Sequence, residues 1–121
     1  MAVLSSDNLF DLTHEVFTGL LDTGATSSWI SPRVIEKLGL VELMKERVSF
    51  AMDEQVAEVY LFRLGLFAGE DGVNGLPYVF AETRGFRLKQ RNDFDVILGM
   101  DILSQGDFSL TRSGKWTLTF Y

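Results

Sequence analysis

Asp22 is the residue of this sequence best suited to carry out chemistry. It begins the segment Asp-Thr-Gly-Ala, which follows a largely apolar stretch at residues 16–21. Glycine and small polar residues after an apolar run are typical of a tight turn at the end of a strand. A carboxylate fixed on such a turn can accept or donate a proton in general acid–base catalysis.

A second informative segment, Phe-Asp-Val-Ile-Leu-Gly-Met-Asp-Ile-Leu, lies far downstream at residues 94–103. Its apolar run predicts a buried strand that ends at Gly99, followed by a short helix that glycine closes at residue 106. We interpret Asp101 as a cap at the start of that helix and Asp95 as an exposed strand-end residue, rather than as catalytic partners of Asp22.

Together, the Asp-Thr-Gly turn and the Ile-Leu-Gly segment resemble the retropepsins, the single-domain aspartic proteases of retroviral type. The resemblance runs from about His14 to the C-terminus. It implies an all-β fold, a closed barrel with a flap hairpin and one or two short helices, in a single domain over residues 1–121. It also implies an aspartic endopeptidase that hydrolyses an extended polypeptide without a metal or cofactor.

The resemblance further implies a homodimer. The chain holds one Asp-Thr-Gly motif and is about half as long as a two-lobed aspartic protease. A twofold axis places identical residues opposite each other, so Asp22 of two subunits would form a dyad that shares one proton. Such a dyad predicts an acidic to mildly acidic optimum.

The resemblance assigns roles to the neighbours of Asp22. Thr23 would bond across the dimer axis, Gly24 would bring its N–H close to the carboxylate, and Ala25 would let the substrate backbone pass. Behind this loop, a buttress is expected from three consecutive residues: Ile97, Leu98 and Gly99. Gly99 would be required where another strand crosses without room for a side chain.

Residues 47–64 are the candidate flap, a hairpin with a polar tip around residues 51–55. Substrate-binding residues are expected in the flap tip and beside the catalytic turn: Ala25, Trp29, Ala51, Met52 and Asp53. Trp29 also suits a plain core position. A mainly apolar groove is expected from Trp29, Ile30 and Phe50.

Two features depart from the family pattern and leave alternatives open. The flap tip holds no glycine, and Met100 and Thr26 stand where many retroviral members have an ion-pair network. The dimer would then depend on the C-terminal strand, residues 116–121. A non-catalytic peptide-binding or dimerisation module with this fold is one alternative, and a monomeric β-domain with a fortuitous turn is another.

Composition excludes several other classes of protein. The 121 residues include no cysteine and one histidine, so thiol catalysis, disulfides and a histidine-rich zinc site are ruled out. The net charge of −6 disfavours nucleic-acid binding. No apolar run is long enough for membrane insertion, and the N-terminus lacks the features of a signal peptide. We therefore expect a cytoplasmic protein or a domain of a larger polyprotein.

The remaining pattern predicts many short strands and one clear helix. Ser31, Pro32 and Gly39 mark the N-cap, first turn and end of that helix. Glycine-rich residues 69–75 predict a loop, the basic and polar residues 84–93 predict a solvated loop, and Ser113-Gly114 predicts a hairpin turn.

Overall fold

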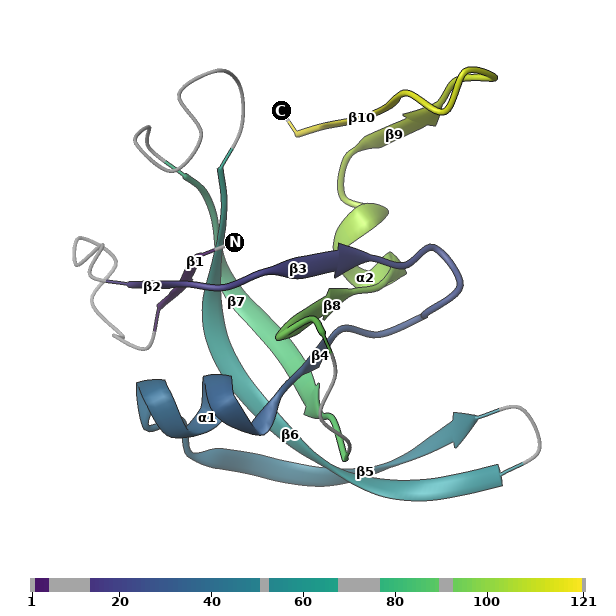
Figure 1. Ribbon diagram of the computed structural model, residues 1–121. Coiled ribbons are helices and arrows are strands. Elements are labelled where there is room, and N and C mark those ends of the chain that lie inside the picture. The colour runs from purple at the N-terminus through teal and green to yellow at the C-terminus, as the bar shows by residue number, and fades with distance from the viewer. Residues whose placement is uncertain (1, 5–13, 51–52, 68–76, 90–92, 121) are drawn as a thin grey trace.

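The computed structural model describes residues 2–4, 14–50, 53–67, 77–89 and 93–120. Strands dominate these residues, and Figure 1 shows them curled about one another. The strands are β1 Ala2–Leu4, β2 Glu15–Val16, β3 Gly19–Leu21, β4 Trp29–Ile30, β5 Glu42–Phe50, β6 Asp53–Leu66, β7 Tyr78–Arg87, β8 Val96–Leu98, β9 Asp107–Leu110 and β10 Trp116–Thr119. The helices are α1 Pro32–Leu38 and α2 Met100–Leu103. The expected all-β class with two short helices is confirmed.

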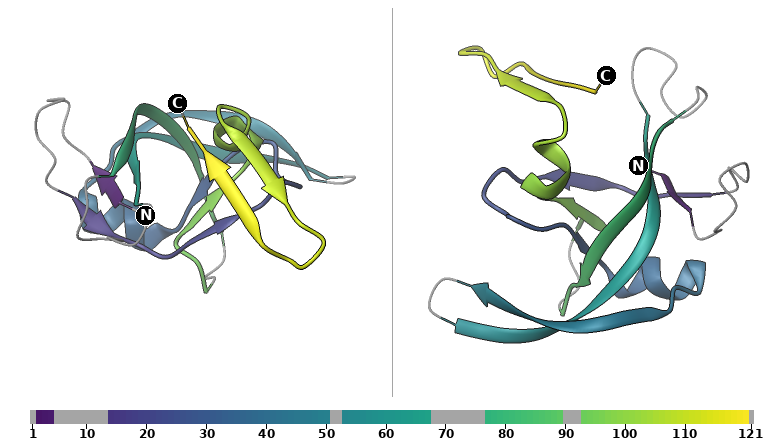
Figure 2. Two further views of the ribbon diagram at one scale, coloured as in Figure 1. Left: turned by 90° about the horizontal axis from the view of Figure 1, so that it is seen from above. Right: turned by 180° about the vertical axis from the view of Figure 1, so that it is seen from behind.

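The main sheet has the order β2-β1-β6-β7-β4-β8-β3, and β5 pairs with β6 at its side. Its two ends, β2 and β3, are separated in the chain by Phe17 and Thr18 alone, so the sheet must curve back toward itself. Figure 2 shows this curl from above. The described residues form a curled half-barrel, and the fully closed barrel stays a prediction.

The core lies inside this curl. Its fully buried members come from β4, α1, β6 and β8: Ile30, Val34, Leu64, Val96 and Leu98. Burying side chains of this size contributes about 1.5–3 kcal/mol each to the free energy of folding. This core fixes β3 beside β8, which sets the position of the residues that follow β3. No helix of the described residues is long and apolar enough to cross a membrane.

The predicted helix after β4 is confirmed together with its end signals. The Ser31 side chain accepts a hydrogen bond from the N–H of Val34, and Pro32 is the first helical residue. Gly39 ends the helix at φ 61°, a left-handed conformation that glycine adopts without a Cβ clash.

The prediction placed the turn between β5 and β6 about two residues too late in the chain. Strand pairing places Phe50 opposite Asp53 and Val48 opposite Gln55, so residues 53–55 belong to β6 rather than to the tip. The long ladder of paired residues overrides the polar composition on which the prediction rested. Ala51 and Met52, which join the strands, lie outside the described residues, as does the predicted loop at residues 69–75.

The prediction of a solvated loop over residues 84–93 was wrong in its first part. Arg84–Arg87 continue β7 and pair with β6, with Tyr60 opposite Gly85 and Val59 opposite Phe86. Polar residues occupy the outer side of this strand, while Phe86 is buried.

The last two strands form a hairpin outside the main sheet. β9 and β10 pair only with each other among the described residues, and Gly114 occupies their turn at φ 88°. The predicted hairpin is thereby confirmed. Figure 1 shows it extending away from the curled sheet. Just after β10, Phe120 returns to the body and packs on Tyr78 and Phe80.

Candidate active site

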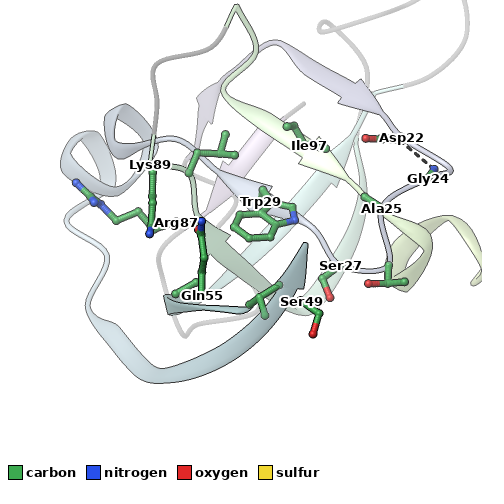
Figure 3. A pocket seen from close by; sticks show the side chains of 14 residues that line it. Asp22, Gly24, Ala25, Ser27, Trp29, Ser49, Gln55, Arg87, Lys89 and Ile97 are labelled. Carbon is green, nitrogen blue, oxygen red and sulfur yellow. Dashed lines mark hydrogen bonds between the residues drawn. The ribbon is translucent and has the colours of Figure 1, made fainter. Parts of the chain in front are cut away.

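The loop after β3 is held by hydrogen bonds to its own backbone and to β8. The Asp22 N–H donates to the Leu98 carbonyl at 2.9 Å, which continues the parallel pairing of β3 with β8. The Gly24 N–H donates to Asp22 Oδ1 at 2.9 Å, and the Ala25 N–H donates to the Asp22 carbonyl at 3.2 Å. These bonds fix the direction of the carboxylate, as Figure 3 shows.

Gly99 allows the loop to lie directly against the start of α2. A Cβ at this position would stand 2.5 Å from the Ser27 carbonyl oxygen and 2.8 Å from that of Ala25. The Met100 N–H donates to the Ala25 carbonyl at 2.8 Å. The expected close crossing at Gly99 is therefore present, but the crossing backbone is the loop itself and not a strand.

Ser28 and Asp101 tie the loop to the start of α2 by side-chain hydrogen bonds. The sequence did not predict this pair. The buried Ser28 Oγ donates to Asp101 Oδ1 at 2.7 Å and accepts from the Gly99 N–H at 3.1 Å. The Ser28 N–H donates to Asp101 Oδ2 at 3.1 Å. Asp101 is not the N-cap residue, because α2 begins one residue earlier with Gly99 as N-cap. Its carboxylate nevertheless accepts from the Ile102 N–H in the first turn at 3.0 Å, so it both anchors the loop and satisfies a donor at the start of the helix.

The Asp22 loop forms one wall of a groove of about 690 Å³. The opposite wall comes from the β5–β6 hairpin, through Val48, Ser49, Gln55 and Ala57. Trp29 and Ile97 lie between the two walls (Figure 3). Among the described residues that line it, the groove thus holds one carboxylate, beside a mostly apolar surface and opposite a long hairpin.

Comparison with known families agrees with this geometry. The family model described as aspartyl protease matches residues 11–102, well over half of the 121 residues. The chain belongs to the aspartyl protease family. Neither curated proteins nor solved structures gave a match to it. The expected family is therefore confirmed at the level of aspartyl proteases of the retropepsin-like clan.

The matched range of this aspartyl protease contains both the Asp-Thr-Gly turn and the Ile-Leu-Gly segment. Of the latter, Leu98 is buried behind the Asp22 loop and Gly99 touches that loop, whereas Ile97 faces the groove. Of the three expected buttress residues, Leu98 and Gly99 therefore lie against the loop, and Ile97 does not.

Only some of the residues expected to bind substrate line the groove. Ala25 and Trp29 line the groove. Trp29 is also only 9% exposed, with its ring centroid 5.1 Å from that of Phe86, so it belongs to the core as well, and its contact with substrate stays a prediction. Ile30 is fully buried in the core and takes no part in the groove. Ala51, Met52 and the side chains of Phe50 and Asp53 lie outside the described residues.

Thr23 faces a different hollow from Asp22. It lines a space of about 580 Å³ next to α2 and the start of β9, together with Met100, Leu103 and Phe108. Two of these apolar residues are well exposed, Met100 at 39% and Phe108 at 38%. The loop therefore presents Asp22 to the groove and Thr23 to an exposed apolar surface.

Asp95 is a structural residue, and its expected exposure was wrong. Its side chain is only 19% exposed, forms an ion pair with Arg33 at 2.6 Å and accepts a hydrogen bond from Ser31 Oγ at 2.9 Å. The carboxylate therefore ties β8 to the start of α1. Among the described residues, no group of three histidine, aspartate or glutamate side chains is arranged to hold a metal ion.

A polar cluster lies beside the far end of the groove. The Tyr60 hydroxyl donates to Glu58 Oε2 at 2.7 Å, and Arg87 Nε lies 3.8 Å from the same oxygen. Burial, followed by this hydrogen bond to Glu58, raises the pKa of Tyr60 to about 12. Tyr60 is therefore neutral at physiological pH and remains a hydrogen-bond donor.

Proposed function

We propose that this aspartyl protease is a homodimeric endopeptidase of retropepsin type, in which Asp22 of two subunits forms the catalytic dyad. The observation that carries the proposal is the position of Asp22: a carboxylate fixed by the Gly24 N–H in one wall of a groove whose other wall is a long hairpin. One chain contributes one such carboxylate, and the chemistry requires two.

The reaction follows from two carboxyl groups sharing one proton. Two negative charges about 3 Å apart cannot both persist, a behaviour well known for aspartic proteases. The ionised member takes a proton from water while the protonated member polarises the scissile carbonyl. The hydroxide so formed adds to the carbonyl carbon, the dyad gives a proton to the amide nitrogen of the tetrahedral intermediate, and the C–N bond then breaks to release the amine and the carboxyl product. Since the dyad titrates as a unit, the rate should follow a bell-shaped pH profile.

The face that carries Thr23 is the proposed dimer surface. Thr23 points to the hollow beside Met100 and Phe108, away from the groove, which suits a hydroxyl that bonds across a twofold axis. The adjoining β9–β10 hairpin exposes apolar side chains, including Leu110 at 67% and Trp116 at 54%. A second copy of the chain would cover this surface and bring the second Asp22 alongside the first.

The β5–β6 hairpin is the proposed flap. It supplies Val48, Ser49, Gln55 and Ala57 to the groove, opposite the Asp22 loop. An extended peptide between these two walls can form strand-like hydrogen bonds with the hairpin, and closure excludes water from the reacting groups.

The substitution Asp22→Asn tests the proposal, because it keeps the shape of the side chain and removes the shared proton. We expect at least a ~100-fold loss of peptide cleavage with an unchanged melting curve. Asp95→Asn is the matched control: it should weaken the link to Arg33 and lower stability by about 1 kcal/mol while cleavage continues. Residual activity of Asp22→Asn within about tenfold of the parent, a loss of only ~1.4 kcal/mol, would reject the proposal.

A further inference from the structure

The groove carries opposite charges at its two ends. Of the described residues that line it, three are charged: Asp22 at one end, and Arg87 and Lys89 at the other. Figure 3 shows this separation, with Trp29 between the two ends. The chain as a whole has a net charge of −6, so the two cations make this end of the groove opposite in charge to the molecule as a whole.

Strand order gives the approximate spacing between these ends. Asp22 follows β3, whose Leu20 pairs with Ile97 on β8. Ile97 pairs with Trp29 on β4, and Trp29 pairs with Phe86 on β7, directly before Arg87. Three strand spacings of about 4.8 Å amount to roughly 14 Å, which an extended peptide covers in about four residues. A substrate side chain about four residues from the scissile bond would therefore reach the basic end.

Arg87 retains donors for such a side chain. Its contact with Glu58 involves Nε at 3.8 Å, and Glu58 already accepts the Tyr60 hydroxyl at 2.7 Å. Both partners are more than a third exposed, so this ion pair is weak. The two terminal nitrogens of the guanidinium suit a bidentate contact with a carboxylate.

We propose that Arg87 and Lys89 form a specificity subsite for an acidic substrate residue, aspartate or glutamate, about four residues from the cleaved bond. The subsite rests on the proposed peptidase function. Between the dyad and the subsite, Trp29 and Ile97 favour apolar side chains. In the twofold dimer the subsite occurs once on each side of the dyad.

Cleavage of matched peptides tests the subsite. Peptides with one Glu, Gln or Lys scanned through the positions on either side of the scissile bond are compared by kcat/KM. We expect about a fivefold preference for Glu over Gln near the fourth position at low salt, declining as salt is added. The double variant Arg87→Gln/Lys89→Gln should lose this preference and still cleave the Gln peptide.

The matched control is Arg84→Gln. Arg84 lies on the same strand, is exposed and pairs with Glu46 at 3.9 Å, but it does not line the groove. It should keep the full preference for Glu. Cleavage with equal kcat/KM for Glu and Gln peptides at every position would overturn the subsite and leave the peptidase function standing.

Binding separates failure of the subsite from failure of the function. The Asp22→Asn protein, which should not cleave, is titrated with the same peptides and followed by fluorescence anisotropy. Tighter binding of the Glu peptide that depends on Arg87 and Lys89 supports the subsite even if the wild-type protein proves inactive. Equal binding of the Glu and Gln peptides contradicts it.

Discussion

The loop at residues 22–28 and the hairpin at residues 107–119 show opposite ways of using hydrogen bonds. The loop is tied to the body by Leu98, Met100 and Asp101, and these bonds come from within the same chain. The hairpin strands pair with each other, and every residue of β9 and most of β10 are exposed. The difference fits the proposed dimer, in which each chain would hold its own Asp22 loop and a second copy would cover the exposed hairpin.

Of the variants that separate the loop from the hairpin, Gly99→Ala in the loop contact is expected to have the largest effect on stability and cleavage. The new methyl group would lie 2.5 Å from the Ser27 carbonyl oxygen, and the neighbouring atoms are backbone that cannot move cheaply. We expect a loss of about 1–3 kcal/mol in the free energy of unfolding, together with a strong loss of cleavage. Urea denaturation and kcat/KM measure the two effects.

Gly39→Ala is the control for this prediction. Gly39 has φ 61° and open space around its Cβ position, so alanine there costs about 1 kcal/mol through backbone strain alone. Cleavage should remain normal. If Gly99→Ala proved no worse than Gly39→Ala in both assays, the contact between the loop and α2 would not be what positions Asp22.

A smaller effect is expected from Trp116→Ser, which acts on the hairpin. Trp116 is 54% exposed and stacks on Phe108 at 6.3 Å, so its removal strips apolar surface without opening the core. The dimer dissociation constant should rise about tenfold or more, because an aromatic residue at an interface contributes on the order of 1–2 kcal/mol. Sedimentation velocity measures the dissociation constant.

Val41→Ser is the matched control, because Val41 is 82% exposed and lies outside the hairpin, just before β5. It should leave dimerisation unchanged. In Trp116→Ser, cleavage per chain should recover at high protein concentration. Unchanged association in Trp116→Ser would show that the second copy binds elsewhere.

The sequence predicted the parts of the site that depend on local signals. The Asp-Thr-Gly turn, the helix with Ser31 and Gly39 at its ends, and the Gly114 hairpin all follow from the conformational preferences of single residues. The contact of Ser28 with Asp101 joins positions 73 residues apart, and no local signal marks it. Arg87 was assigned to a loop because its polarity conceals the end of β7, a strand created by pairing with β6 and β4, whereas Lys89 does lie beyond that strand.

The smallest effect is expected on the pH dependence of stability, through Tyr60 on β6. Its pKa is raised from about 10 in the unfolded chain to about 12, so between these values the unfolded chain loses the proton and the native protein keeps it. Because the native state then binds more protons, the free energy of unfolding should fall as the pH rises from 10 to 12. Tyr60→Phe should reduce this decline in urea melts, and an unchanged decline would contradict the role of Tyr60.

Mixing subunits tests the shared dyad most directly. Wild-type and Asp22→Asn chains are unfolded together in equal amounts, refolded, and assayed at a concentration where both form dimers. If each active site requires Asp22 from two subunits, random pairing leaves about one quarter of the activity of an all-wild-type sample. Activity of about one half, as expected when each chain carries its own complete site, would contradict the shared dyad.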